Sequence, residues 1–408
     1  MRWVSTNWAG NVTFSATRTE HPGSVDEVRR LVAGARTVRA VGTGHSFSRI
    51  ADTTGTQVAL DAMPEVFEVG DRAVRVDAGM RLARLAELLQ ARRLALPAMP
   101  SLPHISVAGA TATATHGSGN DVPSLASLVR RVELVTAEGE PVTFARGEEG
   151  FDGAVVAFGT LGVVTHVELE VVDTFDVEQR VYDDVPLDAL AEDFDAIFGS
   201  AYSVSAFTGW NGRARVFAKH RVGDERRPLR VGRDAPEARH PVEGQPPHRC
   251  TAQLGVPGPW HERLPHFRAD FLPSVGEELQ AEYFVPREHA GRALRALEGL
   301  RDELAPFLLT SEIRTVAAET QWMSMVHDRP SAAFHFTLRP DEVGVRAVLR
   351  RVEEALLPFD PRPHWGKVTE LPDVAGRYPR ARDFAELRAR LDPTGKFRDD
   401  AVDGRFTG

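Results

Sequence analysis

A glycine turn directly after an apolar segment is the feature that most constrains this chain. Residues 37–41 predict a buried strand, and Gly42, Thr43, Gly44 and His45 follow it. Glycines at the end of a strand let backbone N–H groups approach a phosphate closely, because no Cβ stands in the way. A histidine beside such a turn lies next to whatever the turn binds. Taken alone, the pattern favours a structural, hydrogen-bonded role for this histidine.

Length and charge limit the classes of protein to which the chain can belong. Its 408 residues allow two domains, because single cores stop growing near roughly 250–300 residues. The formal net charge of -9 argues against nucleic acid and against an anionic membrane surface as partners. No apolar run approaches the roughly 18 residues of a membrane span, and the N-terminus lacks the apolar core of a signal peptide.

The single cysteine, Cys250, excludes a disulfide framework and any cysteine-based metal site. We therefore expect a cytoplasmic protein without a bound metal. The acidic composition and the lack of an exposed apolar helix favour a monomer.

Periodicity predicts an α+β protein. Residues 24–35 read as a helix that begins with a capping box of Ser24 and Glu27, and residues 82–92 as a second helix. From about residue 173 aromatic residues become frequent, and the remaining predicted elements fall on both sides of that point. They are a hairpin over 131–144, a strand over 159–172, helices over 287–303 and 341–357, and strands over 282–285 and 333–337. Periodicity does not assign the last 45 or so residues to either part.

Residues 97–119 (PAMPSLPHISVAGATATATHGSG) are rich in small side chains and hydroxyls. Such a segment is either an exposed flexible loop or a chain that wraps closely around a large polar ligand. The absence of charged residues favours ligand contact. For His104 and His116 a ligand contact and a bond to a backbone carbonyl stay equally open.

Two predicted strands carry further polar side chains. Alternation places Glu312 and Arg314 on one face of the first, and His335 and Thr337 on one face of the second. Adjacent strands would present these four groups to one cavity, whereas separate strands would leave a solvated sheet face with a surface ion pair. Two interpretations also stay open for His364-Trp365-Gly366-Lys367. The segment is either part of a functional site or a surface turn anchored by a buried indole.

Together these segments resemble one family of flavoproteins. GTGHSF resembles the flavin-attachment motif of the vanillyl-alcohol-oxidase-type proteins, in the branch of the lactone, xylitol and alditol oxidases. SLPHISVAGATATATHGSG resembles the FAD-wrapping segment of that branch, and HWGK with LDPTGKF resembles its C-terminal signature. EIRT, HFT and GVPGPWHERLPHF (residues 255–267) resemble the alditol oxidases most.

The resemblance implies a fold of two domains, an FAD-binding domain of the p-cresol methylhydroxylase type and an α+β cap over the flavin ring. The expected boundaries are 1–172 for the FAD domain, 173–360 for the cap, and 361–408 for a segment that returns to the FAD domain. It also implies that His45 is covalently bound to the 8α carbon of FAD. The other FAD contacts that it implies are Val41, Gly42, Thr43, Gly44, Ser46, Phe47, Ser101, Ser106, Gly109, Thr113, Ala114, Thr115, His116, Val164 and His364.

The implied activity is oxidation of the terminal primary hydroxyl of an alditol, such as xylitol or sorbitol, with reduction of oxygen to hydrogen peroxide. Ser101, Glu312, Arg314, Thr337 and Lys367 match the polyol-binding positions of the family. For the chemistry we expect Lys367 and Arg314 to stabilise developing alkoxide charge. We expect His335 to be the general base, since its ordinary pKa near 6.5 suits proton removal, with Lys367 as the rival base. Glu312 is expected to hold a second hydroxyl and to orient His335.

One position departs from the family pattern, and three alternatives stay open. Pro100 stands where the alditol oxidases tend to have alanine, near the oxygen-reactive carbon of the flavin, so it affects oxygen access or merely constrains the backbone before Ser101. The alternatives are an aldonolactone oxidase or dehydrogenase, a non-catalytic sugar-binding protein on the same fold, and a nucleotide-sugar reductase that uses NADPH.

Overall fold

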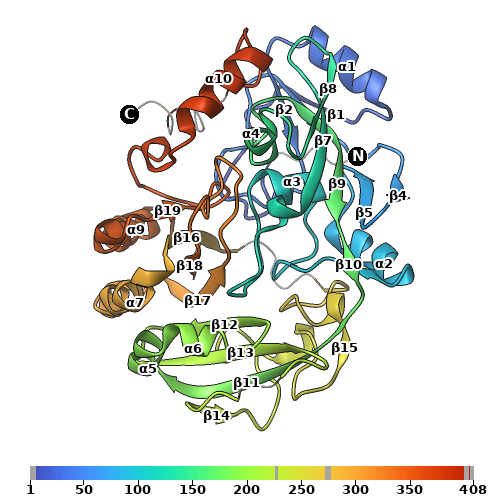
Figure 1. Ribbon diagram of the computed structural model, residues 1–408. Coiled ribbons are helices and arrows are strands. Elements are labelled where there is room, and N and C mark those ends of the chain that lie inside the picture. The colour runs from blue at the N-terminus through green and yellow to red at the C-terminus, as the bar shows by residue number, and fades with distance from the viewer. Residues whose placement is uncertain (1–5, 226–227, 272–276, 399–403, 405–408) are drawn as a thin grey trace.

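The computed structural model describes residues 6–225, 228–271, 277–398 and 404, and within these ranges the strands form four sheets (Figure 1). Three of the sheets use strands from the first 173 residues. The first is parallel, in the order β1 (Arg18–Glu20), β3 (Thr56–Ala59) and β2 (Val38–Val41). The second is antiparallel, in the order β4 (Phe67–Val69), β5 (Ala73–Asp77), β9 (Val163–Glu170), β7 (Val129–Val135) and β8 (Pro141–Ala145). The third pairs β6 (Leu94–Ala95) with β10 (Val172–Asp173).

The fourth sheet is antiparallel, and its strands lie between residues 176 and 363. Its strands follow the order β14 (Arg233–Asp234), β11 (Asp176–Pro186), β13 (Arg213–Arg221), β12 (Ser203–Thr208), β17 (Leu308–Val316), β18 (Ser331–Leu338), β16 (Leu279–Pro286) and β19 (Arg362–Pro363), with β15 (Gly258–Pro259) paired to β11. Strand β18 therefore lies between β17 and β16, an arrangement that the site depends on.

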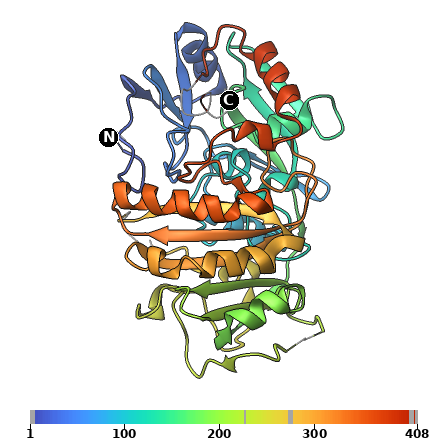
Figure 2. The same cartoon turned by 90° about the vertical axis from the view of Figure 1, so that its left-hand side faces the viewer.

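Helices cover these sheets. In the N-terminal part they are α1 (Val25–Gly34), α2 (Leu82–Ala91), α3 (Val107–Ala112) and α4 (Phe151–Val155). Helices α5 (Leu187–Glu192), α6 (Phe194–Phe198), α7 (Ala290–Glu298), α8 (Arg301–Leu304) and α9 (Glu342–Leu356) accompany the large sheet, and Figure 2 shows α7 and α9 running along it. Helix α10 (Ala381–Leu391) lies near α4. The mixture of helices and sheets confirms the predicted α+β class.

The predicted capping box of α1 is present in a shifted form. The Ser24 hydroxyl accepts a hydrogen bond from the Glu27 backbone N–H, while the Glu27 carboxylate accepts one from the Gly23 N–H. Val28 and Val32 are fully buried beneath the helix, so the predicted apolar face packs on the sheet.

Two predictions of secondary structure were wrong. Residues 287–303 do not form one helix, because the chain turns at Gly299 and Leu300 between α7 and α8. Residues 107–112 form α3, where we predicted no helix: their small side chains permit close packing of this short helix inside the protein.

The C-terminal segment runs back to the N-terminal sheets. The Phe47 N–H donates to the Gly366 carbonyl at 2.6 Å, and the Val38 N–H donates to the Lys396 carbonyl at 3.0 Å. Buried Trp365 fixes this path, since its indole N–H donates to the Met323 carbonyl and its ring packs on Phe158.

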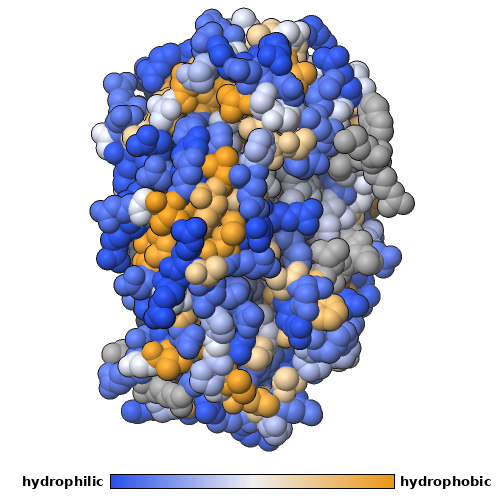
Figure 3. Space-filling view, turned by 90° about the vertical axis from the view of Figure 1, so that its right-hand side faces the viewer, coloured by the Kyte–Doolittle hydropathy of each residue, from blue (hydrophilic) through white to orange (hydrophobic). Residues whose placement is uncertain are grey.

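On the face shown in Figure 3 hydrophilic residues predominate and apolar ones gather in small groups. In the described ranges no helix is long and apolar enough to cross a membrane.

Candidate active site

A cavity of about 1020 Å³ brings together segments that lie far apart in the sequence. The turn after β2, the segment around α3, strands β16, β17 and β18, and the turn around Lys367 all line it. The residues that the sequence singled out line this cavity, except Ala114, whose side chain is fully buried beside it. The lining set is Val41, Gly42, Thr43, Gly44, His45, Ser46, Phe47, Pro100, Ser101, Ser106, Gly109, Thr113, Thr115, His116, Val164, Glu312, Arg314, His335, Thr337, His364 and Lys367.

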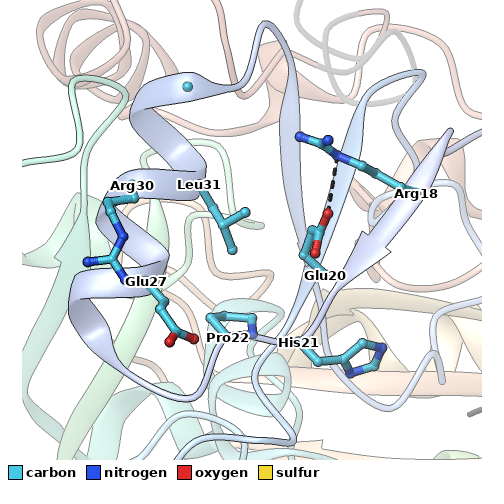
Figure 4. Close-up of a pocket in the computed structure, with 8 residues that line it drawn as sticks. Arg18, Glu20, His21, Pro22, Glu27, Arg30 and Leu31 are labelled. Carbon is cyan, nitrogen blue, oxygen red and sulfur yellow. Dashed lines mark ion pairs between the residues drawn. The ribbon is translucent and has the colours of Figure 1, made fainter.

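A smaller hollow of about 380 Å³ lies between β1 and α1 (Figure 4). The charged groups that line it are largely exposed, and Figure 4 shows the 3.4 Å ion pair of Arg18 and Glu20 at its edge. It lacks the buried polar side chains of the large cavity.

The turn after β2 requires glycine because the backbone there lies very close to Ser106. A Cβ on Gly42 would lie 2.4 Å from the Ser106 hydroxyl oxygen, and one on Gly109 would lie 2.9 Å from the same atom. Gly44 has a φ of +70°, which few other residues adopt without strain. Glycine therefore lets the end of β2 and the start of α3 meet at the wall of the cavity.

His45 is held in place without an acidic partner among the described residues. Its Nδ1 lies 3.0 Å from the Thr43 hydroxyl and 3.1 Å from the Thr43 carbonyl, and its ring stacks on Trp8 with centroids 5.1 Å apart. Burial lowers the pKa of His45 to about 4, so the imidazole is neutral at pH 7.

The predicted alternation of polar residues on β17 and β18 is correct. Glu312 lies directly opposite His335, and Thr310 lies opposite Thr337. Because β17 and β18 are neighbours in the sheet, the Glu312, Arg314, His335 and Thr337 side chains face the same cavity. Of the two interpretations left open, the structure therefore has the single cavity rather than the solvated sheet face.

The sequence reasoning missed Glu282 on β16. Its fully buried carboxylate accepts a hydrogen bond from the Arg314 guanidinium at 2.5 Å and lies 3.3 Å from Nε2 of His116. Burial works to raise the pKa of this carboxyl, but Arg314, His116 and His335 together outweigh burial and hold the pKa well below its usual range. Glu282 thereby joins the segment around α3 to the polar side of the cavity.

A second missed residue, Gln280, links the two candidate bases. Its amide oxygen accepts hydrogen bonds from His335 Nε2, at 3.1 Å, and from Lys367 Nζ. The lysine can only donate, so it fixes which end of the amide faces it, and His335 must then carry its proton on Nε2.

The prediction that Glu312 orients His335 was wrong. The Glu312 carboxylate instead lies 3.2 Å from His266 Nε2 and 3.7 Å from the Arg314 guanidinium. Strand β16 flanks His335 on the other side, and Gln280 from that strand takes the ring nitrogen. Polar residues on β16 were visible in LQAEYFVP, but their partners depend on the order of strands in the sheet.

Burial sets the charges of the two candidate bases. It lowers the pKa of His335 to about 3 and that of Lys367 to about 8. For Glu312 burial opposes ionisation, but Arg314 and His266 outweigh it and keep the pKa well below its usual range. At pH 7 the site therefore holds two carboxylates, the Arg314 cation, a mostly protonated Lys367 and a neutral His335.

Two protein-family models match parts of this chain. A model described as FAD binding domain matches residues 18–145, and one described as D-arabinono-1,4-lactone oxidase matches residues 277–404. An alditol oxidase from Streptomyces sp. is 49% identical over 97% of this chain and 97% of its own length. An L-gulono-1,4-lactone dehydrogenase from Mycobacterium tuberculosis is 28% identical, also over 97% of each chain.

Among solved structures, a cholesterol oxidase from B. sterolicum superimposes with a TM-score of 0.78 over 98% of this chain and 96% of that chain, at 14% identity. At that identity the likeness concerns the fold alone, and it confirms the predicted fold of the vanillyl-alcohol oxidase and p-cresol methylhydroxylase type.

The cavity fits FAD on the evidence of its own walls. Its volume lies at the upper end of the roughly 300–1,000 Å³ of small-molecule sites, which leaves room for a dinucleotide beside a small substrate. Within the described residues, Nδ1 of His104 is buried at the cavity without a hydrogen-bond partner. This unpaired nitrogen and the glycine-lined wall suit a large ligand that is rich in polar groups.

Proposed function

The chain belongs to the alditol oxidase family of flavoproteins, and we propose that it oxidises the terminal primary hydroxyl of alditols such as xylitol and sorbitol. FAD is its cofactor, oxygen is the electron acceptor and hydrogen peroxide the second product. One observation carries the proposal: Glu312, Arg314, His335, Thr337 and Lys367 face the same cavity as the turn that holds His45. The 49% identity to a curated alditol oxidase over nearly the full chain supports it.

Bound FAD would supply the acceptor for the hydride of the alcohol carbon and the route of its electrons to oxygen. The protein must hold the polyol and accept the hydroxyl proton. Glu312 and Thr337 bind hydroxyls beyond the reacting carbon together with Ser101, and Arg314, anchored by Glu282, stabilises negative charge on the reacting oxygen.

Lys367 is the proton acceptor in this proposal, in place of His335. A base works best when its pKa lies near the working pH, and burial brings the pKa of Lys367 to about 8 but that of His335 to about 3. His335, oriented by Gln280, instead binds a substrate hydroxyl through its free Nδ1.

We propose further that His45 is covalently bound to the 8α carbon of FAD. A neutral imidazole has the free electron pair that attack on an oxidised flavin methyl group needs, and burial keeps His45 neutral. Stacking on Trp8 restrains the ring at the wall of the cavity. The other FAD contacts that the family resemblance implies remain part of this proposal, as does a role for Pro100 in oxygen access.

The division into domains 1–172, 173–360 and 361–408 is also a proposal. It is supported by the change of sheet after β10 and by the backbone hydrogen bonds of Gly366 to Phe47 and of Lys396 to Val38, whereas Arg362 and Pro363 still belong to the large sheet as β19. A monomeric state and a cytoplasmic location rest on composition alone.

A second candidate is oxidation of an aldonolactone. The match of residues 277–404 to the lactone oxidase model favours it, because that segment contributes most of the polar side of the cavity. Lactone and alditol differ in the number of free hydroxyl groups that Glu312 and Thr337 can bind.

A peroxide assay across glycerol, xylitol, sorbitol and a galactono-lactone tests the proposal. We expect peroxide with xylitol and sorbitol, and little with the lactone. Peroxide or dye reduction with the lactone alone would favour the second candidate. Acid precipitation tests the covalent link: wild-type protein keeps its yellow colour in the pellet, and a His45→Ala variant releases it.

A further inference from the structure

Behind Glu312 lies a chain of buried polar side chains that the proposed mechanism does not use. Lys219 on β13 and His266 in the segment after β15 are almost fully buried, and Glu312 completes the chain at the cavity wall. We infer that Lys219 and His266 are positioning residues that hold the Glu312 carboxylate in place for polyol binding. The inference rests on the proposed function and names the support of one of its substrate-binding residues.

Successive contacts connect Lys219 in the interior, through His266, to Glu312 at the cavity. Lys219 Nζ donates to the Leu264 carbonyl and lies 3.4 Å from His266 Nδ1. His266 Nε2 lies 3.2 Å from Glu312 Oε1 and 3.3 Å from the Ser205 hydroxyl. An ammonium group cannot accept a hydrogen bond, so Nδ1 of His266 accepts one from Lys219. Nε2 of His266 then carries the ring hydrogen and donates a hydrogen bond to Glu312.

The imidazole is fixed by more than its hydrogen bonds. The edges of Phe207 and Phe217 meet the ring of His266 at centroid distances of 5.1 and 5.5 Å, nearly perpendicular to it. Phe207 also lies directly opposite Glu312 in the sheet. The ring therefore has little freedom to turn, and the direction of its N–H toward Glu312 is set in advance.

A buried lysine is costly, so its presence needs a compensating interaction. Within the described residues, no carboxylate forms a direct ion pair with Lys219, and burial lowers its pKa to about 7. The negative charge that compensates the ammonium group is that of the Glu312 carboxylate, and the neutral imidazole of His266 lies between the two groups. Lys219, which does not line the cavity, thereby places its positive charge behind His266 and Glu312, which both line it.

The charges around Lys219 predict how pH acts on binding. Glu312 stabilises the ammonium form and Arg314 opposes it. Below pH 7 Lys219 is mostly charged and supports Glu312; as pH rises through about 7 this charge is lost. The dissociation constant for polyol should therefore rise across this range in the wild type, and a variant without Lys219 should lack the rise.

The test is a double-mutant cycle on the complete flavoprotein, measured by anaerobic reduction of the flavin by xylitol, which gives a dissociation constant and a limiting rate. Lys219→Met should raise the dissociation constant about tenfold, at the lower end of what a hydrogen bond to a charged group supplies, with the limiting rate changed much less. In a Glu312→Gln background the same change should have an effect of less than about twofold, since the residue it supports is already altered.

Lys396→Met is the control, because Lys396 Nζ also donates to a backbone carbonyl, that of Val32, and neither residue lines the cavity. It should leave the dissociation constant unchanged. If Lys219→Met does not fold, His266→Gln replaces it in the same cycle and should show the same dependence on Glu312.

Three outcomes decide the matter. A wild-type dissociation constant retained in Lys219→Met, or an equal loss in both Glu312 backgrounds, overturns the positioning role. Flavin that no polyol reduces in the wild type overturns the proposed function itself, and the inference with it.

Discussion

The proton acceptor can be identified from the sign of a pH dependence. With a pKa of about 8, roughly one Lys367 side chain in ten is neutral at pH 7, and most are neutral at pH 9. If Lys367 takes the hydroxyl proton, the limiting rate of flavin reduction at saturating xylitol rises about tenfold per pH unit up to about pH 8 and is constant above it. Lys367→Met should lose this slope and be slower by about 10²- to 10⁴-fold.

The pH at the midpoint of this rise in the limiting rate gives a second test of the same prediction. Glu282 is the carboxylate that most raises the pKa of Lys367, against the larger lowering by burial, and Glu278 raises it less. Glu282→Gln should therefore move the midpoint to a lower pH, and Glu278→Gln should move it by a smaller amount in the same direction. The ranking follows from the structure and does not depend on the absolute rates.

Anaerobic stopped-flow between pH 6 and 9.5 measures the limiting rate directly, without the oxygen reaction. Polyol must be saturating at each pH, so that the binding contribution of Lys219 does not enter. A limiting rate that falls above pH 8 would refute the reasoning, since Lys367 would then act as a cation, and the base would be His335 or another group.

Two further predictions concern stability and cofactor retention. Burial raises the pKa of Glu319 from 4.5 to about 7, so its contribution to stability is fully present below about pH 4.5 and is lost as pH rises through about 7. At pH 8 Glu319→Gln should be more stable to urea than the wild type by about 3 kcal/mol, with little gain at pH 4.5 and no gain in the exposed Glu288→Gln control. A Cβ on Gly79 would lie 2.4 Å from the Leu60 carbonyl oxygen, so Gly79→Ala should lose FAD and melt earlier, whereas Gly34→Ala, with open space around its Cβ, should retain FAD. Equal FAD content in the two alanine variants would contradict the packing argument.

The sequence predicted the walls of the cavity better than the connections between them. The GTGHSF turn and the EIRT and HFT strands could be recognised because their signal is local: glycines before a histidine, and polar residues alternating in apolar strands. Glu282 and Gln280 show the same alternation, but their importance depends on β18 lying between β16 and β17. Strand order in an antiparallel sheet is a long-range property that periodicity does not contain.

The missed positioning residues have a different cause. Lys219 lies in the strand RARVFAKHR, where a lysine among other basic residues is typical of a solvated face, and His266 lies in a loop segment. Only the fold shows that both are buried and that the loop places His266 beside Glu312. The short helix α3 was missed because Gly109 and the β-branched Val107 and Thr111 have low helix propensity, and six residues are too few to show a helical period.

The charges of the buried polar groups in the cavity predict a preference for neutral polyols. With Lys367 neutral, Glu282, Glu312 and Arg314 carry one net negative charge, and a proton from the substrate on Lys367 neutralises it. Proton transfer in that direction is therefore supported by both carboxylates. A substrate that carries its own carboxylate, such as a sugar acid, would add a third negative charge to a buried site and lose hydration in entering it. Alditols present only hydroxyls, which these charged groups can bind without any change in the net charge of the site.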